Sequence, residues 1–482
     1  MAGKQWSGAS HQSSHCEALS RMSLSAIDRR WWVTLNISVG IYMSTLDASI
    51  VNISLPTITK ALNTNLTAVA WVVMGYLIVI TGCLLLMGRL SDLLGQRTVY
   101  LFGFLTFTVG SALCGLSPTI YFLIGSRMLQ GLGASALMAI GPAIITTAFP
   151  EEDRGQVLGI LGSVVSAGFL TGPLLGGFLV EHLGWRSVFY INLPIGAVGI
   201  FLSMRVLERS RAKGKIKVDL WGAFLLFLFV TSFLLFLNQA GEGSAAPLWR
   251  WLFLSLLCFC LFIAVELRSG SPLVDLRLFR RRLFVSSLGT SLLSFWMTAA
   301  HTFVVPFFLQ NILGFSPSKV GMLIFPVSVT VMVMAPLGGR FSDRAGVRVP
   351  ATMGLTLMSL TVFSFTFLKG EASNLDILWR QVALGIGIAL FNPANNSAII
   401  GSLSREKIGL ASSFLALARN LGMVIGVAFA EMVIALRLPV TQLKTGTGSP
   451  SLEGIQDVWK LVLVIGLTAV LISWIREGRS AN

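Results

Sequence analysis

The feature that most constrains this chain is a series of apolar blocks, each about 20 residues long, separated by short polar segments. A block of that length forms a helix that crosses the roughly 30 Å hydrocarbon layer of a membrane. The sequence therefore predicts an all-α polytopic membrane protein. We expect fourteen spans, at residues 31–55, 68–88, 98–116, 120–148, 155–180, 187–204, 220–239, 249–265, 283–309, 320–339, 350–368, 377–401, 408–435 and 458–475.

The composition excludes an ordinary water-soluble protein. Charged residues make up 12% of the chain and hydrophobic residues 54%, whereas soluble domains carry about 25% charged residues. The net charge of +15 would indicate a nucleic-acid partner in a soluble protein, but here the basic residues lie in loops between apolar spans. No helix-turn-helix, zinc-finger or RNA-recognition pattern is present. We expect the lipid bilayer as partner, and no nucleic acid.

The cysteines and the short motifs give no sign of an enzyme or a metal protein. Four of the five cysteines lie inside apolar spans, and Cys16 lies near His11 and His15 in a polar stretch that we expect to be a tail. The chain shows no H-E-x-x-H, no G-x-S-x-G and no paired intramembrane acids. We expect no metal and no organic cofactor, and we see no signal peptide before Trp31.

The distribution of Lys and Arg predicts the orientation in the membrane. With a cytoplasmic N-terminus, 25 of the 36 basic residues fall in inner segments, 8 fall in outer segments, and Arg127, Arg380 and Arg419 lie within spans. Basic residues concentrate on the cytoplasmic side of membrane proteins. We therefore expect both termini to be cytoplasmic.

An internal repeat divides the spans into two sets. The segment GRLSDLLGQR begins at Gly88, and GRFSDRAGVR begins at Gly339. Three pairs are separated by 251 to 253 residues: Asp92 and Asp343, Arg127 and Arg380, and Pro142 and Pro393. Parallel repeats of this kind are typical of transporters.

The repeat predicts a domain organisation with two homologous halves. We expect six-helix bundles at residues 31–204 and 283–475, separated by basic loops and two inserted helices at 205–282. The remaining parts are cytoplasmic tails at residues 1–30 and 476–482. The sequence does not indicate a role for the inserted helices.

The first repeated loop resembles the G-x-L-x-D-R-x-G-R-R signature of the major facilitator superfamily. It departs from the signature at Leu93 and Gln96, whereas the second copy keeps more of it. The glycines are expected to allow tight packing at a sharp turn. The resemblance implies an inner gate made by Gly88, Asp92, Gly95, Arg97, Gly339, Asp343 and Arg344.

Three further segments resemble the fourteen-helix drug:proton antiporters of the EmrB/QacA type. They are TLDASIVNISLP from Thr45, RMLQGLG from Arg127, and GFLTGPLLGG from Gly168. The last one is similar to an antiporter motif, with Gly168, Gly172, Pro173, Gly176 and Gly177. The resemblance implies the major facilitator fold, with two six-helix bundles plus two central helices, and proton-driven export by alternating access.

The cost of placing a charge inside the membrane makes Asp47 and Arg127 the candidates for proton coupling. Asp47 is the carboxylate that we place well inside a span, and a charge at that depth costs at least about 2.5–3.5 kcal/mol unless it is paired or solvated. Both residues lie about eight residues from the outer end of their spans, so they share a depth. They either face each other or share a water-filled cavity. The pair is a proton switch or a static ion pair that orients two helices.

Other residues in the spans are further candidates for helix packing, proton coupling or lining of a cavity. Gly168, Gly172 and Gly176 share one helix face, where a neighbouring helix can approach closely. His301 is a further coupling or cavity candidate, and its alternative is a neutral residue of the core. Arg380 and Arg419 either line a polar cavity or pair with other helices.

We interpret the chain as a proton-coupled antiporter of the bacterial inner membrane that exports lipophilic, often cationic small molecules, as in multidrug efflux and antibiotic resistance. The proton is the coupling ion. The alternative is an exporter of an endogenous lipid or metabolite, for which a periplasmic adaptor protein is a candidate partner. A panel of cationic dyes distinguishes the two, because the alternative predicts no protection against any dye.

The predicted topology can be tested by labelling single cysteines in a cysteine-free background. Lys213→Cys should react with a membrane-impermeant thiol reagent from the cytoplasmic side, and Gly243→Cys from the opposite side. Equal labelling of both positions from the cytoplasm would contradict the fourteen-span topology.

Overall fold

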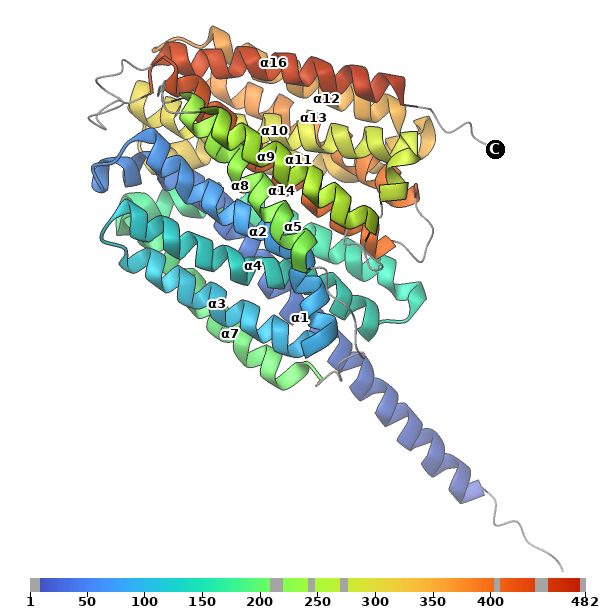
Figure 1. The fold of residues 1–482 in the computed structure, drawn as a ribbon. Helices are drawn as coiled ribbons and strands as arrows, with labels where there is room; N and C mark the ends of the chain where they lie inside the picture. The colour runs from blue at the N-terminus through green and yellow to red at the C-terminus, as the bar shows by residue number, and fades with distance from the viewer. Residues whose placement is uncertain are drawn as a thin grey trace, which may run out of the picture.

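The computed structural model describes residues 9–208, 220–241, 248–268, 276–402, 408–437 and 450–476. These residues form helices and their connections, with no strand among them (Figure 1). The predicted all-α class is confirmed for this part of the chain. The described segments include every candidate site residue named above, whereas Cys16 lies where no side chain is described.

The helices follow one another with short connections. The first group contains α1 (Ala9–Ala61), α2 (Leu66–Leu94), α3 (Gln96–Leu116), α4 (Ile120–Ala148), α5 (Glu151–Leu183), α6 (Ser187–Tyr190) and α7 (Asn192–Val206). A hairpin of α8 (Leu220–Gly241) and α9 (Leu248–Arg268) follows. The second group contains η1 (Leu276–Arg280), α10 (Arg282–Phe307), η2 (Phe308–Ile312), α11 (Pro317–Ala345), α12 (Arg348–Ser364), η3 (Phe365–Phe367), α13 (Asn374–Gly401), α14 (Ile408–Ala435) and α16 (Leu452–Ile475).

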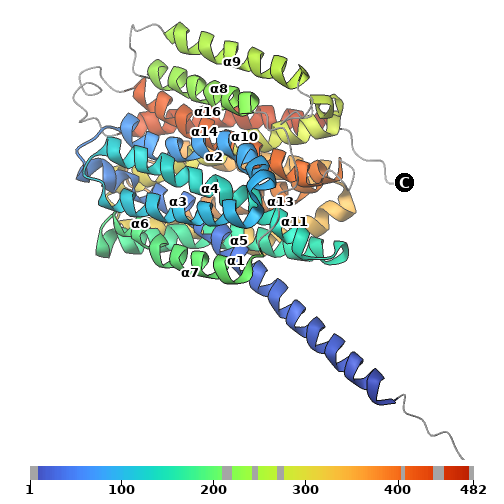
Figure 2. The ribbon, with the colours of Figure 1, turned by 60° about the horizontal axis from the view of Figure 1, so that its bottom comes forward.

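Helix α1 begins earlier than the sequence analysis predicts. The expected tail at residues 1–30 is helical from Ala9 onward, and this part extends away from the packed helices (Figures 1 and 2). Residues 9–30 contain neither Gly nor Pro, so nothing in their backbone chemistry ends a helix. The predicted start of the first span near Trp31 therefore lies inside a longer helix.

Twelve helices of the described residues are long and apolar enough to cross a membrane, two fewer than predicted. The predicted spans at 31–55 and 220–239 are the two that this count leaves out. Helix α1 is rich in buried polar side chains, including Asn36, Ser44 and Asp47, which lower its apolar character. Helix α8 contributes a shorter apolar stretch, Phe224–Leu237.

Side-chain caps fix where several helices begin. Asn65 Oδ1 accepts the backbone N–H of Ala68 at 2.8 Å before α2, and Ser316 caps α11 ahead of Pro317. Ser373 and Asp376 form a reciprocal capping box at α13. Such caps satisfy backbone donors that a helix leaves without partners. They therefore fix the first residues of α2, α11 and α13.

The two groups pack against each other along two pairs of helices. Helix α5 packs along α11, and α2 packs along α14. The hairpin of α8 and α9 lies along one edge of the molecule and contacts α2 and α14 through α8 (Figure 2). The start of α1 and the end of α16 lie toward the same end of the molecule (Figure 1).

Hydrogen bonds between the two groups gather toward the end that carries residues 62–65, which we call the closed end. Thr67 Oγ1 in α2 donates to Glu431 Oε1 in α14 at 2.6 Å, and both residues are buried. Gln310 Nε2 donates to the carbonyl of Ile53 at 2.9 Å. The N–H of Ser318 donates to Glu181 Oε2, also at 2.9 Å. These contacts join helices of both groups at one end.

Glycine brings the backbones of α5 and α11 into direct contact. A β-carbon on Gly177 would lie 2.5 Å from the carbonyl oxygen of Pro317, and one on Gly321 would meet the carbonyl oxygen of Pro173. The obstacle is backbone in both cases, so no side chain can move aside. The closed end therefore depends on the absence of β-carbons at these two positions.

Replacing Gly321 with Ala should weaken the closed end. The added methyl group has to displace the backbone of α5, and overpacking of this kind costs about 1–3 kcal/mol. Gly162→Ala is the matched control, since a β-carbon there meets nothing within 4 Å. Distances between spin labels at the closed end should lengthen in Gly321→Ala and stay unchanged in Gly162→Ala. Unchanged distances in both variants would contradict this packing role.

Candidate functional site

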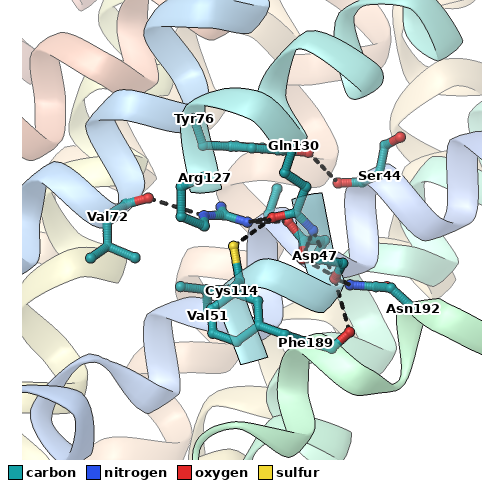
Figure 3. A network of polar contacts seen from close by, with 12 residues as sticks. Ser44, Asp47, Val51, Val72, Tyr76, Cys114, Arg127, Gln130, Phe189 and Asn192 are labelled. Carbon is teal, nitrogen blue, oxygen red and sulfur yellow. Dashed lines mark hydrogen bonds and ion pairs between the residues drawn. The ribbon is translucent and has the colours of Figure 1, made fainter. Parts of the chain in front are cut away.

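Asp47 and Arg127 form a buried ion pair inside the first group of helices. Arg127 Nη1 lies 2.5 Å from Asp47 Oδ2, and the side chains of Asp47 and Arg127 are 0% and 1% exposed. Asp47 comes from α1 and Arg127 from α4 (Figure 3). Of the two arrangements that the sequence left open, direct contact is the one that the structure shows.

Two side-chain amides complete the surroundings of the carboxylate. Asp47 Oδ1 accepts hydrogen bonds from Gln130 Nε2 and from Asn192 Nδ2, each at 2.9 Å (Figure 3). The same two amides also donate to Ser111 Oγ, each at 3.1 Å. Ser111 in turn donates to the carbonyl of Phe189 at 2.8 Å. The network thus joins α1, α3, α4, α6 and α7.

The guanidinium of Arg127 is held on its other sides as well. Its Nε donates to the carbonyl of Val72 at 3.1 Å, and its Nη1 donates to Gln130 Oε1 at 2.5 Å. The ring of Tyr76 lies 4.0 Å from the guanidinium carbon, a cation–π distance. Arg127 therefore connects α4 to α2 and to the carboxylate of α1.

This arrangement fits an ionised carboxylate. A carboxylate only accepts hydrogen bonds, and Asp47 receives donors on both oxygens. A proton on Asp47 would turn one acceptor into a donor directed at an N–H group. A bound proton also removes the negative charge of Asp47, so the protonated carboxyl and the ion pair with Arg127 are mutually exclusive.

The predicted glycine face lies against α1 next to this network. A β-carbon on Gly168 would meet Thr45, and one on Gly172 would meet Ser49. Ser49 Oγ also donates to the carbonyl of Gly168 at 3.2 Å. Gly176 meets Ile50, so the three glycines form the close helix contact that their spacing predicts. Pro173 and Gly177 instead face α11.

The two repeated loops form the turns between α2 and α3 and between α11 and α12. Gly95 and Gly346 adopt φ of +89° and +73°, a region that L side chains rarely adopt. The expectation of tight packing is wrong at Gly88, because nothing lies within 4 Å of its β-position, and at Gly339, where the nearest atom is 3.9 Å away. Both lie inside helices rather than at the turn.

Three acidic and basic residues of these loops, Asp92, Asp343 and Arg344, take part in no ion pair between described residues. Arg97 Nη2 donates to the carbonyl of Met204 at 2.8 Å. The gate role of these loops stays a prediction.

Three further candidates lie apart from the Asp47 network. His301 is buried in the second group, with its ring centroid 4.7 Å from that of Phe365. Arg380 donates to the carbonyl of Asp376 at 2.6 Å and to Ser364, so it pairs within its own region of α13 and α12. Arg419 is half-buried in α14.

The comparisons with known proteins agree with this architecture. The family model described as Major Facilitator Superfamily matches residues 37–427. The chain belongs to this superfamily. Its members are membrane transporters rather than enzymes, and the chain is a polytopic membrane protein with small-molecule transport as its general function.

Curated relatives in this superfamily differ in the cargo that their names state. The chain is 33% identical over 436 residues to a protein named Riboflavin transporter RibZ from Clostridioides difficile, covering 89% of this chain and 94% of that protein. It is 34% identical over 408 residues to the Multidrug resistance protein Stp of Mycobacterium tuberculosis, covering 84% and 75%.

A solved structure shares the fold. A bacterial homologue of the human lysosomal transporter Spinster matches with a TM-score of 0.66 at 15% sequence identity, covering 93% of this chain and 97% of that one. This level of identity supports the major facilitator fold alone.

Sequence reasoning missed several residues of the site. Gln130 lies three residues after Arg127, which places both on one helix face, so its role was predictable. Asn192 and Ser111 are polar residues inside apolar spans, but nothing in the sequence directs them to Asp47. Asn192 Oδ1 is buried without a hydrogen-bond partner among the described residues.

The ion pair should show strong coupling in a double-mutant cycle. Arg127→Gln leaves the Asp47 carboxylate buried without its cation, which costs about 3–5 kcal/mol. Asp47→Asn combined with Arg127→Gln removes both charges and should cost less than Arg127→Gln alone. Thermal unfolding of the purified variants in detergent measures this, and additive costs of the single variants would contradict a direct pair.

Proposed function

We propose that this transporter is a proton-coupled antiporter that exports lipophilic, often cationic small molecules by alternating access. The observation that carries the proposal is the Asp47 carboxylate, which receives one cationic and two amide donors from α4 and α7. Proton binding to Asp47 breaks that arrangement. The pair is therefore a switch with two states, rather than a fixed brace.

In this proposal, protonation releases Arg127 from α1. The guanidinium keeps its hydrogen bonds to Val72 and to Gln130, so the cation stays with α2 and α4 while α1 becomes free to shift. Water does not reach the pair here, because both side chains are almost fully buried. The proton is consequently taken up and released in other states of the cycle.

A continuous set of contacts leads from Asp47 to the interface between the halves. Thr45 and Ser49 flank Asp47 on α1 and pack on Gly168 and Gly172 of α5. Further along α5, Gly177 packs on the backbone of α11 in the other half. A shift of α1 therefore acts on α5, whose contact with α11 helps to hold the closed end.

The orientation and the number of spans belong to the same proposal. The bias of 25 inner against 8 outer basic residues supports a cytoplasmic position for both termini. We add α1 and α8 to the twelve apolar helices, because α1 runs through the first group and α8 packs along α2 and α14. The closed end then faces outward, and the described state faces the cytoplasm.

The driving force is that of one proton per cycle. A proton supplies about 1.36 kcal/mol per pH unit, and about 2.3 kcal/mol per 100 mV of membrane potential. Exchange for a monovalent cation is electroneutral, so only the pH difference remains. No metal and no organic cofactor takes part in this scheme, and we place the protein in a bacterial inner membrane.

Relatives named as multidrug transporters support export of varied compounds. The chain is 30% identical over 413 residues to the Multidrug transporter protein MdtP of Bacillus subtilis. A second candidate function is transport of an endogenous metabolite, which is favoured by the relative named a riboflavin transporter. The adaptor considered for that alternative stays a prediction, because residues 438–449 of the long outer segment lie outside the described residues.

Asp47→Asn should abolish proton-coupled transport. The amide keeps the shape of the side chain but neither gains nor loses a proton at the pH values at which the transporter works. In inside-out vesicles, addition of a cationic dye should release protons through the wild type and not through the variant. Dye binding to the purified variant should persist within about threefold, which separates coupling from folding.

The matched control is Glu371→Gln, which removes an acid from an exposed connection. This variant should exchange protons for dye at the wild-type rate. Full exchange by Asp47→Asn would remove Asp47 from the coupling role, and loss of exchange in Glu371→Gln would show that the assay responds to net charge.

A further inference from the structure

Arg419 is a cation within the membrane for which the described residues offer no counter-ion. It lies inside the apolar part of α14, Phe414–Ala435, and it is half-buried. Arg127 and Arg380 are engaged by a carboxylate, by carbonyl oxygens or by hydroxyl groups. No ion pair or hydrogen bond between described residues includes Arg419. A charge kept at such a depth indicates a function.

The contacts of α14 show which way Arg419 faces. Gly422 and Gly426 pack on the backbone of α10, at Leu292 and Trp296. Glu431 faces α2 of the other half through Thr67. At about 100° per residue, Arg419 lies on the arc between the face toward α10 and the face toward α2.

The opposite side of α14 is apolar. Leu417 and Leu421 lie roughly across the helix from Arg419 and belong to the partly buried apolar residues around the core. That side is the one suited to α8 and to lipid, because a charged group facing lipid is costly. Arg419 therefore points toward the space between the two halves.

Two other N–H groups also lack acceptors among the described residues, one on Asn420 directly after Arg419 and one on Trp296, which packs about 10 Å further along α14. Asn420 is 2% exposed, and its Nδ2 has no hydrogen-bond partner. Trp296 in α10 packs its ring against Phe429 of α14, and its Nε1 has no partner either. Donors without acceptors are costly to bury. A ligand that brings oxygen acceptors would satisfy both Arg419 and the Asn420 amide that follows it in the chain.

We propose that Arg419 binds an acidic group of the transported molecule, a carboxylate or an equivalent anionic oxygen. A guanidinium holds a carboxylate through two parallel hydrogen bonds, and the amide of Asn420 supplies a further donor beside it. The inference builds on the proposed function by naming a substrate class: compounds with an apolar ring system and an acidic group, including zwitterions. Cationic character elsewhere in the molecule is compatible with this site.

The test uses two dyes that differ in the acidic group. Rhodamine B carries a free carboxylate, and rhodamine 6G has a related ring system with an ethyl ester in its place. Fluorescence anisotropy with the purified full-length protein should give tighter binding of rhodamine B than of rhodamine 6G. Arg419→Gln should weaken rhodamine B binding about tenfold or more and leave rhodamine 6G within twofold. Arg419→Lys should recover part of the loss, because it keeps the charge.

Controls separate this result from folding and from proton coupling. Arg437→Gln, just beyond the end of α14 and largely exposed, should bind both dyes as the wild type does. Gel filtration and thermal unfolding report whether Arg419→Gln is folded, and Arg419→Lys provides a second folded variant. Equilibrium binding needs no proton gradient, so a failure of proton coupling in vesicles leaves this measurement intact.

Two outcomes would overturn the proposal. Equal weakening of both dyes by Arg419→Gln would assign Arg419 to the structure of α14. Preference of the wild type for rhodamine 6G, or binding of neither dye, would show that the site does not select an acidic group.

Discussion

The ion pair between Asp47 and Arg127 is the interaction on which the first half depends. Two opposite charges are removed from water inside a bundle, and each is satisfied by fixed neighbours: Asp47 by Gln130 and Asn192, Arg127 by the carbonyl of Val72. Removing water makes such an arrangement sensitive to any change of charge. In the proposed function, a proton on Asp47 therefore acts on all five helices that the network joins.

The glycine contacts determine which helices a shift of α1 acts on. Helix α5 lies between α1 and α11, with Gly168 and Gly172 toward one neighbour and Gly177 toward the other. Because α5 offers only glycine backbone to Thr45 and Ser49, it has no side chain of its own at these contacts that could rearrange to absorb a shift of α1. The region that carries the charge and the region where the halves meet are thus mechanically adjacent.

The sequence predicted the parts of the site that follow from the spacing of residues along a helix. Equal depth along two helices placed Asp47 beside Arg127, and a spacing of four residues placed three glycines on one face. The repeat was less informative about individual residues. Spacing pairs Arg380 with Arg127, but Arg380 forms its hydrogen bonds within its own region of the second half. The residue 251 positions after Gln130 is Gln381. Asn192 could not be predicted, because its approach to Asp47 depends on how α7 packs on α1. The length of α1 was missed because polar residues without Gly or Pro can extend a helix beyond a span.

The hairpin of α8 and α9 makes the two flanks of the molecule unequal. On one flank, α8 lies over the line where α2 meets α14, with Phe227 against Gly82. On the other flank, α5 meets α11 beside the exposed apolar side chains of Phe178 and Met322. A compound dissolved in the bilayer consequently encounters the seam between the halves from one direction, whereas approach from the other is screened by protein.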